Sequence, residues 1–145
     1  MAEDRPIYAV IDTNVLVSAL LASSDRSNPM RVILAILSGK IIPMYNSEII
    51  SEYREVLSRK KFPFTSGQIY DLLNYFITFG IDCQRIDVND EVFPDKDDRV
   101  VYEVRMSVEG SYLVTGNLRH FPHKPYVVTP AQMLEILQEH ELMIS

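Results

Sequence analysis

The chain has 145 residues, of which 47% are hydrophobic and 23% are charged. This length suits one domain with a substantial core, and the composition excludes disordered and fibrous proteins. The formal net charge of −6 excludes a nucleic-acid binder that works through an overall positive field, although a local basic face can still bind RNA.

The single cysteine, Cys83, excludes an intramolecular disulfide and is typical of a reducing compartment. The first six residues are polar and lack a secretory signal, and no apolar run approaches the roughly 20 residues that span a bilayer. We therefore expect a cytoplasmic protein without membrane contact, folded as one domain over residues 1–145.

A buried strand is predicted over Ile7–Ile11, and it stops at Asp12, Thr13 and Asn14. Its consecutive apolar residues indicate a strand covered on both faces, as in a parallel sheet. The apolar segment 15–21 is then predicted to be a helix, with Thr13 or Asn14 as its cap. An acid at the carboxyl end of such a strand is well placed to bind a ligand, although Asp12 can also simply cap the helix.

The later elements follow from capping and periodicity signals. Asn28 is the expected N-cap of a helix with Pro29 in its first turn, Thr65 and Gln68 form a capping box, and Pro43 indicates a strand near an edge or with interrupted pairing. The helix after Thr65 carries an apolar stripe: Ile69, Leu72, Leu73, Phe76 and Ile77. The remaining predicted helices are 30–38, 48–57 (capped by Asn46 or Ser47), 99–108 and the one from Pro130; the remaining strands are 40–45, 83–88, 111–115 and 126–128. This alternation predicts an α/β fold with a mainly parallel sheet.

Acidic and amide side chains lie where the predicted sheet would bring them together. Asp12 and Asn117 each follow an apolar strand, so both should emerge at the same edge. Glu52 lies on a helix whose apolar side packs inward, and Asp98 lies at the start of a later helix. We prefer Asp98 to its neighbours because it fits best against the following helix. Of those neighbours, Asp95 is taken as an auxiliary acid and Asp97 as the alternative.

These oxygen ligands predict a site for Mg²⁺ or Mn²⁺, because crowded carboxylates repel one another without a cation. Such an ion can activate water and stabilise charge on a phosphoryl oxygen, as phosphodiester hydrolysis requires. The chain has no paired-cysteine zinc pattern and no glycine-rich phosphate loop. A haloacid-dehalogenase type phosphatase would need an aspartate at the position of Asn14.

Four segments together resemble a PIN domain, and more narrowly the PIN proteins that are toxin components of toxin–antitoxin systems. The segments are Asp12–Ala19, Ser47–Tyr53, Asp95–Arg99, and Leu113–Asn117 with Arg119–Pro122. The resemblance covers nearly the whole chain and implies a three-layer α/β/α fold with about five strands. It also implies endoribonuclease activity that depends on Mg²⁺ or Mn²⁺.

The resemblance also implies roles for individual residues. Asp12, Glu52 and Asp98 would hold the metal, and the supporting residues would be Thr13 or Asn14 together with Thr115. Many PIN nucleases have a fourth acid where this chain has Asn117. We therefore expect one tightly held ion, with the amide of Asn117 orienting water or helping to bind the ion.

Basic residues near these motifs are candidates for contacts with RNA phosphates, whether the RNA is single-stranded or structured. Arg119, His120, His123 and Lys124 follow Asn117 directly, and the run Arg59–Lys61 ends a predicted helix. Basic residues at a helix end also stabilise the helix dipole, which is the alternative explanation for that run. A small antitoxin protein and a second copy of the chain are the partners that the resemblance implies.

Three hypotheses follow from the sequence. The leading one is a metal-dependent endoribonuclease that acts as a toxin. The second is a catalytically weak or silent PIN module that binds RNA or a protein partner. The third and weakest is a small-molecule phosphatase on a similar sheet, which would cleave a phosphate monoester in preference to RNA.

Overall fold

The structure is a computed structural model that describes residues 5–89 and 91–144. Five strands form one sheet in the order β3-β2-β1-β4-β5, and all neighbouring strands are parallel. The elements in chain order are β1 (Ile7–Ile11), α1 (Thr13–Leu21), α2 (Asn28–Leu37), β2 (Ile41–Tyr45), α3 (Ser47–Leu57), α4 (Ser66–Phe79), β3 (Ile81–Asp82), α5 (Lys96–Arg105), β4 (Tyr112–Val114), the 3₁₀ turn η1 (Leu118–His120), β5 (Val127–Val128) and α6 (Pro130–Ile144). The predicted α/β class is confirmed, including its three layers.

The central strand β1 determines where the site forms. Its neighbours are β2, in which Met44 is the partner of Val10, and β4, in which Leu113 is the partner of the same residue. Because all three strands run in one direction, the residues that follow them meet at one edge of the sheet. Asp12 emerges at the middle of this edge, and its backbone amide donates to the carbonyl of Val114 at 2.9 Å.

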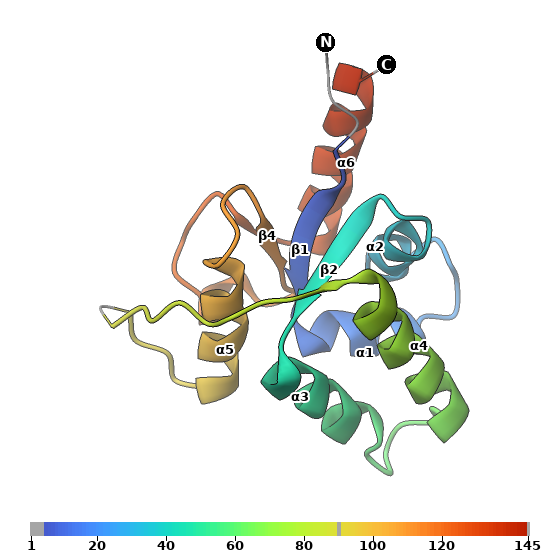
Figure 1. Cartoon of the computed structure of the whole chain (residues 1–145). Coiled ribbons are helices and arrows are strands. Elements are labelled where there is room, and N and C mark those ends of the chain that lie inside the picture. The colour runs from blue at the N-terminus through green and yellow to red at the C-terminus, as the bar shows by residue number, and fades with distance from the viewer. Residues whose placement is uncertain (1–4, 90, 145) are drawn as a thin grey trace.

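Helices cover both faces of the sheet. α5 packs against β1, β2 and β4 on one side, whereas α2 and α4 contact β2 on the other and α6 contacts α2 and β5. Figure 1 shows α3 at the carboxyl end of the strands and α6 extending from the opposite end of the molecule. No helix in the described part of the chain is long and apolar enough to span a bilayer.

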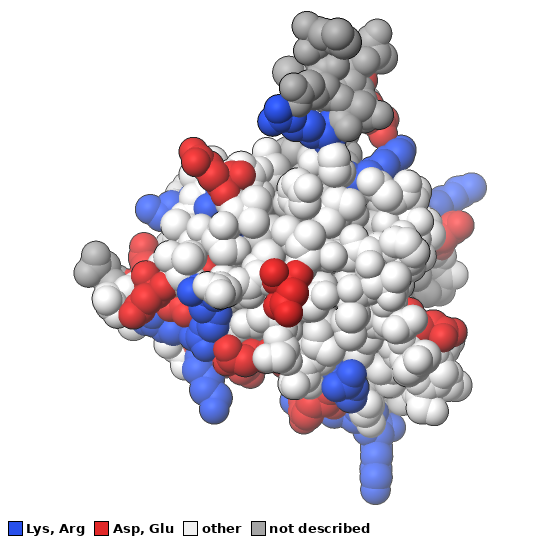
Figure 2. Space-filling model, viewed as in Figure 1, with Lys and Arg blue, Asp and Glu red and all other residues white. Residues whose placement is uncertain are grey.

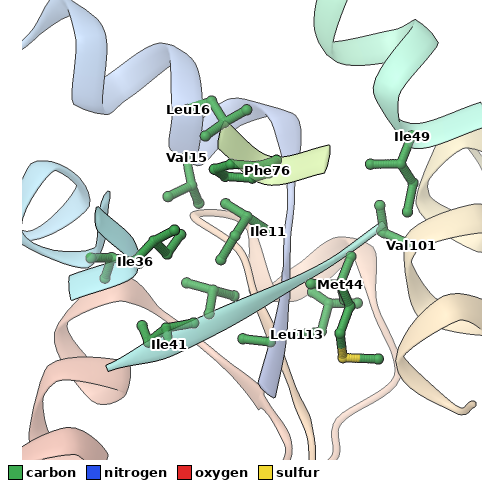
Figure 3. Packing of buried hydrophobic residues seen from close by; sticks show 14 of the residues in the cluster. Ile11, Val15, Leu16, Ile36, Ile41, Met44, Ile49, Phe76, Val101 and Leu113 are labelled. Atoms are coloured by element: carbon green, nitrogen blue, oxygen red, sulfur yellow. The ribbon is translucent and has the colours of Figure 1, made fainter. Parts of the chain in front are cut away.

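The hydrophobic core holds the carboxyl end of β1 in place. Figure 3 shows Ile11 surrounded by apolar side chains from several elements, including Val15 and Leu16 of α1 and Phe76 of α4. Ile11 and Leu16 are fully buried, and each such side chain contributes about 1.5–3 kcal/mol to folding. The loop that begins at Asp12 therefore starts from a rigidly packed strand.

Several local predictions are confirmed. Asn46 caps α3 by accepting from the amide of Ile49 at 2.8 Å, and Thr65 and Gln68 form the capping box of α4. The N-cap of α2 is Ser27 and not Asn28, because the Ser27 hydroxyl accepts from the amide of Met30. Likewise the N-cap of α1 is Asp12, so the prediction of Thr13 or Asn14 is wrong.

The predicted strand 83–88 is wrong, because β3 contains only Ile81 and Asp82. After it the chain leaves the sheet and crosses α5, where the guanidinium of Arg85 pairs with Glu103 at 2.8 Å. An ion pair across the helix thus determines the path of a segment that resembles a strand in sequence. Residue 90, in the following predicted acidic loop, lies outside the described residues.

Two further expectations need correction, and the one for Pro43 is confirmed in part. The helix predicted at 99–108 is α5, which begins three residues earlier, so Asp98 lies inside its first turn. Ile77, predicted in the apolar stripe of α4, is 45% exposed. Pro43 lies in an internal strand and pairs with Ala9 of β1, but β3 pairs only with Met44 and Tyr45. The interrupted pairing that the proline predicts is therefore found on the β3 side.

Candidate functional site

Asp12 lies at the N-cap position of α1, but it does not act as a side-chain cap. Its carboxylate is turned toward β4 and accepts a hydrogen bond from Thr115 Oγ1 at 2.8 Å. Thr115 in turn accepts from the amide of Asn117 at 3.0 Å. A buried threonine therefore connects the first predicted acid to the predicted amide, and this arrangement contradicts a purely capping role for Asp12.

The residues after Asp12 hold α1 against its neighbours. The hydroxyl of Thr13 donates to Glu52 Oε2 in α3, and Asn14 Oδ1 accepts from the amide of Gly116 at 3.3 Å. Both side chains thus face other parts of the site instead of capping α1, which explains why the capping prediction fails. The hydrogen bond of Thr13 thus holds Glu52 close to the start of α1, next to Asp12 in sequence.

Acids at the start of α5 complete the group. Asp95 is the N-cap and accepts from the amide of Asp97 at 2.9 Å. Asp98 is 8% exposed, and its Oδ2 lies 3.4 Å from Nδ1 of His120. Asp97 and Glu52 line the same groove, and the negative charge of Asp97 raises the pKa of Glu52. The structure therefore brings both of the competing acids to the site, Asp97 toward α3 and Asp98 toward η1.

We call Asp12, Glu52, Asp95, Asp97 and Asp98 the acid cluster. Burial raises the pKa of Asp12, although the hydrogen bond from Thr115 opposes this effect. Burial also raises the pKa of Glu52 to about 7, and the charges of Asp97 and Asp12 add to the increase. The pKa of Asp98 is raised to about 6 by burial and by the charges of Asp12 and Asp95. Negative charge in the cluster is thus incompletely balanced by the protein.

The acid cluster fits a hard divalent cation, because such ions bind carboxylate oxygens. A bound cation would also offset the repulsion between the carboxylates. Within the described residues, however, no three histidine, cysteine, aspartate or glutamate side chains converge as a ready metal site. Glu52 is engaged by Thr13, and Asp98 faces His120. Binding an ion would therefore require side-chain rotation at these two positions.

The 3₁₀ turn η1 brings the predicted RNA-contacting residues to the edge of the cluster. Asn117 Nδ2 lies 3.1 Å from His120 Nε2, and His120 contacts Asp98. Arg119 is exposed on the same turn, and Lys124 is exposed a few residues beyond it. Neither of these two basic side chains forms an ion pair with a described residue, so both can reach a ligand.

Sequence reasoning missed the role of Tyr53 at this site. Its ring is fully buried beside Phe76, but its hydroxyl donates to the carbonyl of Ile11, the last residue of β1. Burial and the charges of Asp12 and Glu52 raise its pKa well above 10. The sequence feature that could have indicated this role is the position of Tyr53 directly after Glu52, on the inward side of the helix.

A family model described as PIN domain matches residues 8–119 of the chain. The matched segment contains every member of the acid cluster, together with Thr115 and Asn117. Neither a curated protein nor a solved structure matches the chain. PIN domains are generally nucleases and typically use divalent metal ions.

Proposed function

The chain belongs to the PIN domain family, and from this premise we propose that it is a Mg²⁺- or Mn²⁺-dependent endoribonuclease. The observation that carries the proposal is that Asp12, Glu52 and Asp98 lie on three separate segments around the carboxyl edge of β1. Thr115 donates to Asp12, Thr13 donates to Glu52, and Asp98 contacts His120 of η1. The raised pKa values of all three acids support a role as cation ligands.

Asp12, Glu52 and Asp98 would hold the ion, with Asp95 and Asp97 as nearby auxiliary acids. When bound, a divalent ion supplies charge stabilisation at a phosphoryl oxygen and acidifies water for attack. The protein itself positions the carboxylates. The hydroxyls of Thr13 and Thr115 orient Glu52 and Asp12 by donating to them.

The turn after β4 would act on the substrate side of the cluster. Asn117 offers an amide that can orient water, and its backbone is fixed through Thr115. His120 is 54% exposed beside Asp98, so its ring can reach a substrate phosphate. Arg119 and Lys124 would add phosphate contacts from the same loop.

The test is cleavage of a labelled single-stranded RNA with Mn²⁺ and with EDTA, by the wild type and by Asp12→Asn. Asparagine keeps the size of the side chain and an oxygen that can accept from Thr115, so the loss of cleavage would follow from the loss of charge. We expect cleavage only by the wild type with metal. Equal cleavage by both proteins, or cleavage in EDTA, would contradict the proposed mechanism.

A second candidate is a weak or silent PIN module that binds RNA or a protein partner. Two observations favour it: no ready three-ligand site is present in the described residues, and Asn117 brings no charge. Calorimetric titration with Mn²⁺ separates the two candidates, because a silent module would not bind the ion. Turnover of a phosphate monoester without RNA cleavage would instead identify a phosphatase.

The cellular role that we propose is that of a toxin controlled by a small antitoxin protein. It is supported by the segments Asp12–Ala19 and Asp95–Arg99, which resemble PIN toxins. A homodimer is proposed on the same basis. Light scattering should detect the dimer in the purified protein and the antitoxin complex after co-expression with the antitoxin. Release of RNA cleavage on removal of the partner would support the toxin role.

A further inference from the structure

We propose that the loop Arg59–Phe64, between α3 and α4, binds single-stranded RNA on the side of the site opposite η1. We call this segment the basic-aromatic loop. The inference rests on the proposed nuclease function, because it assigns a binding surface for the same substrate. It also predicts a preference for unpaired over paired RNA.

A groove of about 610 Å³ connects the acid cluster to this loop. It is lined by Glu52 and Asp97 of the acid cluster, follows one side of α3 from Ser47 and reaches Arg59. From Glu52 to Arg59 the chain advances seven residues, or about 10 Å at the rise of a helix. That distance corresponds to about three nucleotides of a stacked strand.

Apart from Glu52 and Asp97, the residues that line the groove do not repel a phosphate chain strongly. The two other acids of the groove each pair with an arginine: Glu48 with Arg85 at 2.9 Å, and Glu55 with Arg59 at 2.9 Å. The hydroxyls of Ser47 and Ser51 also line it and can donate hydrogen bonds. Among the lining residues, uncompensated negative charge is thus confined to Glu52 and Asp97, where the ion is proposed to bind.

The loop presents two lysines at the corner of a turn. The amide of Phe62 donates to the carbonyl of Arg59 at 3.0 Å, which leaves Lys60 and Lys61 as the two central residues of the turn. Both lysines are exposed, and neither pairs with an acid among the described residues. In Figure 2, basic side chains project from the end of the molecule where Figure 1 places this loop.

An aromatic platform lies beside the lysines. Phe64 packs against the hydrophobic core, and Phe62 stacks on it with ring centroids 5.4 Å apart and planes inclined by 18°. The ammonium of Lys61 lies 5.2 Å from the centroid of Phe62. Since a ring face that attracts a cation can also stack with a base, an unpaired base can replace the ammonium, which then moves to a phosphate.

The combination favours RNA as the ligand over a lipid surface, because the groove leads from this loop to the proposed site of phosphodiester cleavage. It favours a single strand, because a base can reach Phe62 only when it is not paired. RNA would therefore extend from η1, across the acid cluster and along α3 to the basic-aromatic loop.

The test measures the affinity of the protein for a labelled oligo(U) by fluorescence anisotropy. EDTA is present, so the proposed metal-dependent cleavage does not occur. Lys60→Ala/Lys61→Ala should weaken binding about tenfold at low salt and lower the slope of log K against log salt by about 1.4. The matched control is Arg26→Ala/Arg31→Ala, which removes two exposed charges from the α1–α2 region and should change affinity less than about twofold.

Phe62 is tested with two variants that keep an apolar side chain against Phe64. Phe62→Leu removes the aromatic face and should weaken oligo(U) binding about fivefold or more, with no loss for an RNA duplex of equal length. Phe62→Tyr should restore wild-type affinity. Circular dichroism establishes that each variant is folded before its affinity is compared.

Unchanged affinity in the lysine variant, or equal losses for duplex and single strand in Phe62→Leu, would overturn the proposal. Lysine-dependent binding to vesicles containing phosphatidylserine, without binding to oligo(U), would overturn it in favour of a lipid surface. Failure of the proposed function is seen separately, as the absence of Mn²⁺-dependent cleavage by the wild type. Because binding is measured without metal, the two failures are distinguishable.

Discussion

Replacing Asp98 with asparagine should stabilise the protein when no divalent ion is present. Asp98 is nearly buried, and its pKa rises from an ordinary value of 3.8 to about 6 because of burial and the charges of Asp12 and Asp95. A carboxyl group whose pKa is raised in the folded state favours folding at pH below 3.8. That contribution is lost as the pH rises through about 6. At pH 8 the wild type therefore carries a charge that opposes folding.

The size of the effect can be worked out from the pKa of Asp98. The rise from 3.8 to about 6 sets an upper limit of about 3 kcal/mol, at 1.36 kcal/mol per pKa unit. Solvent screening near the surface reduces this to about 1.5 kcal/mol. Asparagine also removes a favourable charge from the first turn of α5, which costs about 0.5 kcal/mol. The expected net gain is about 1 kcal/mol, or about 3 °C in the unfolding midpoint.

The assay is thermal unfolding followed by circular dichroism in EDTA, near pH 8 and near pH 4. Asp98→Asn should unfold at higher temperature than the wild type near pH 8 and gain nothing near pH 4. Saturating Mn²⁺ should reverse the order, because binding at 100 times Kd stabilises the wild type by about 2.7 kcal/mol. Asp71→Asn, on the exposed side of α4, is the control and should change neither midpoint. A variant less stable than the wild type near pH 8 in EDTA would refute this explanation.

Two further predictions concern the support of the acid cluster, and a third concerns the ion pair between Arg85 and Glu103. Tyr53→Phe should lower the free energy of unfolding by about 1–2 kcal/mol in urea denaturation, because a buried carbonyl loses its donor. Thr13→Val should raise the pKa of Glu52 further, so the pH midpoint of Mn²⁺ binding, measured by calorimetry, should move upward. Glu103 is buried, which raises its pKa, but hydrogen bonds led by that from Arg85 lower it overall. Arg85→Gln should therefore destabilise the protein at neutral pH, and the loss should shrink as the pH falls and Glu103 is protonated, in urea titrations at several pH values.

The fold was largely predictable because its signals are local. Continuous apolar residues specify β1, and side-chain caps specify the starts of α3 and α4. The segment 83–88 misleads because its path is set by Arg85 and Glu103, which are 18 residues apart. An ion pair between distant positions leaves no periodic pattern in the sequence, so its effect on the backbone cannot be deduced from propensity.

The position of the candidate residues at one edge of the sheet was predictable, but their contacts were not. The positions of Asp12 and Asn117 could be predicted because each follows a strand, and the carboxyl ends of neighbouring parallel strands lie at one edge of the sheet. The hydrogen bond between Thr13 and Glu52, and the approach of His120 to Asp98, depend on how α3 and η1 pack. Those distances follow from side-chain volumes in the core, which no spacing in the sequence encodes.

The acid cluster departs from the physical rules that the rest of the chain follows. Outside the cluster, the buried charges of the described residues have favourable partners: Glu103 is held by Arg85 and Arg99, and Arg105 donates to the carbonyl of Ser111 and lies over the ring of Tyr126. Asp12 is buried to a similar degree, but its side-chain hydrogen bond comes from the neutral Thr115, and the charge of Asp95 adds to the effect of burial in raising its pKa. A stable fold gains nothing from this arrangement, because neutral residues of the same size would pack without the repulsion. The loss of folding stability is explained if the cluster binds a cation, because relief of the repulsion between the carboxylates then strengthens cation binding.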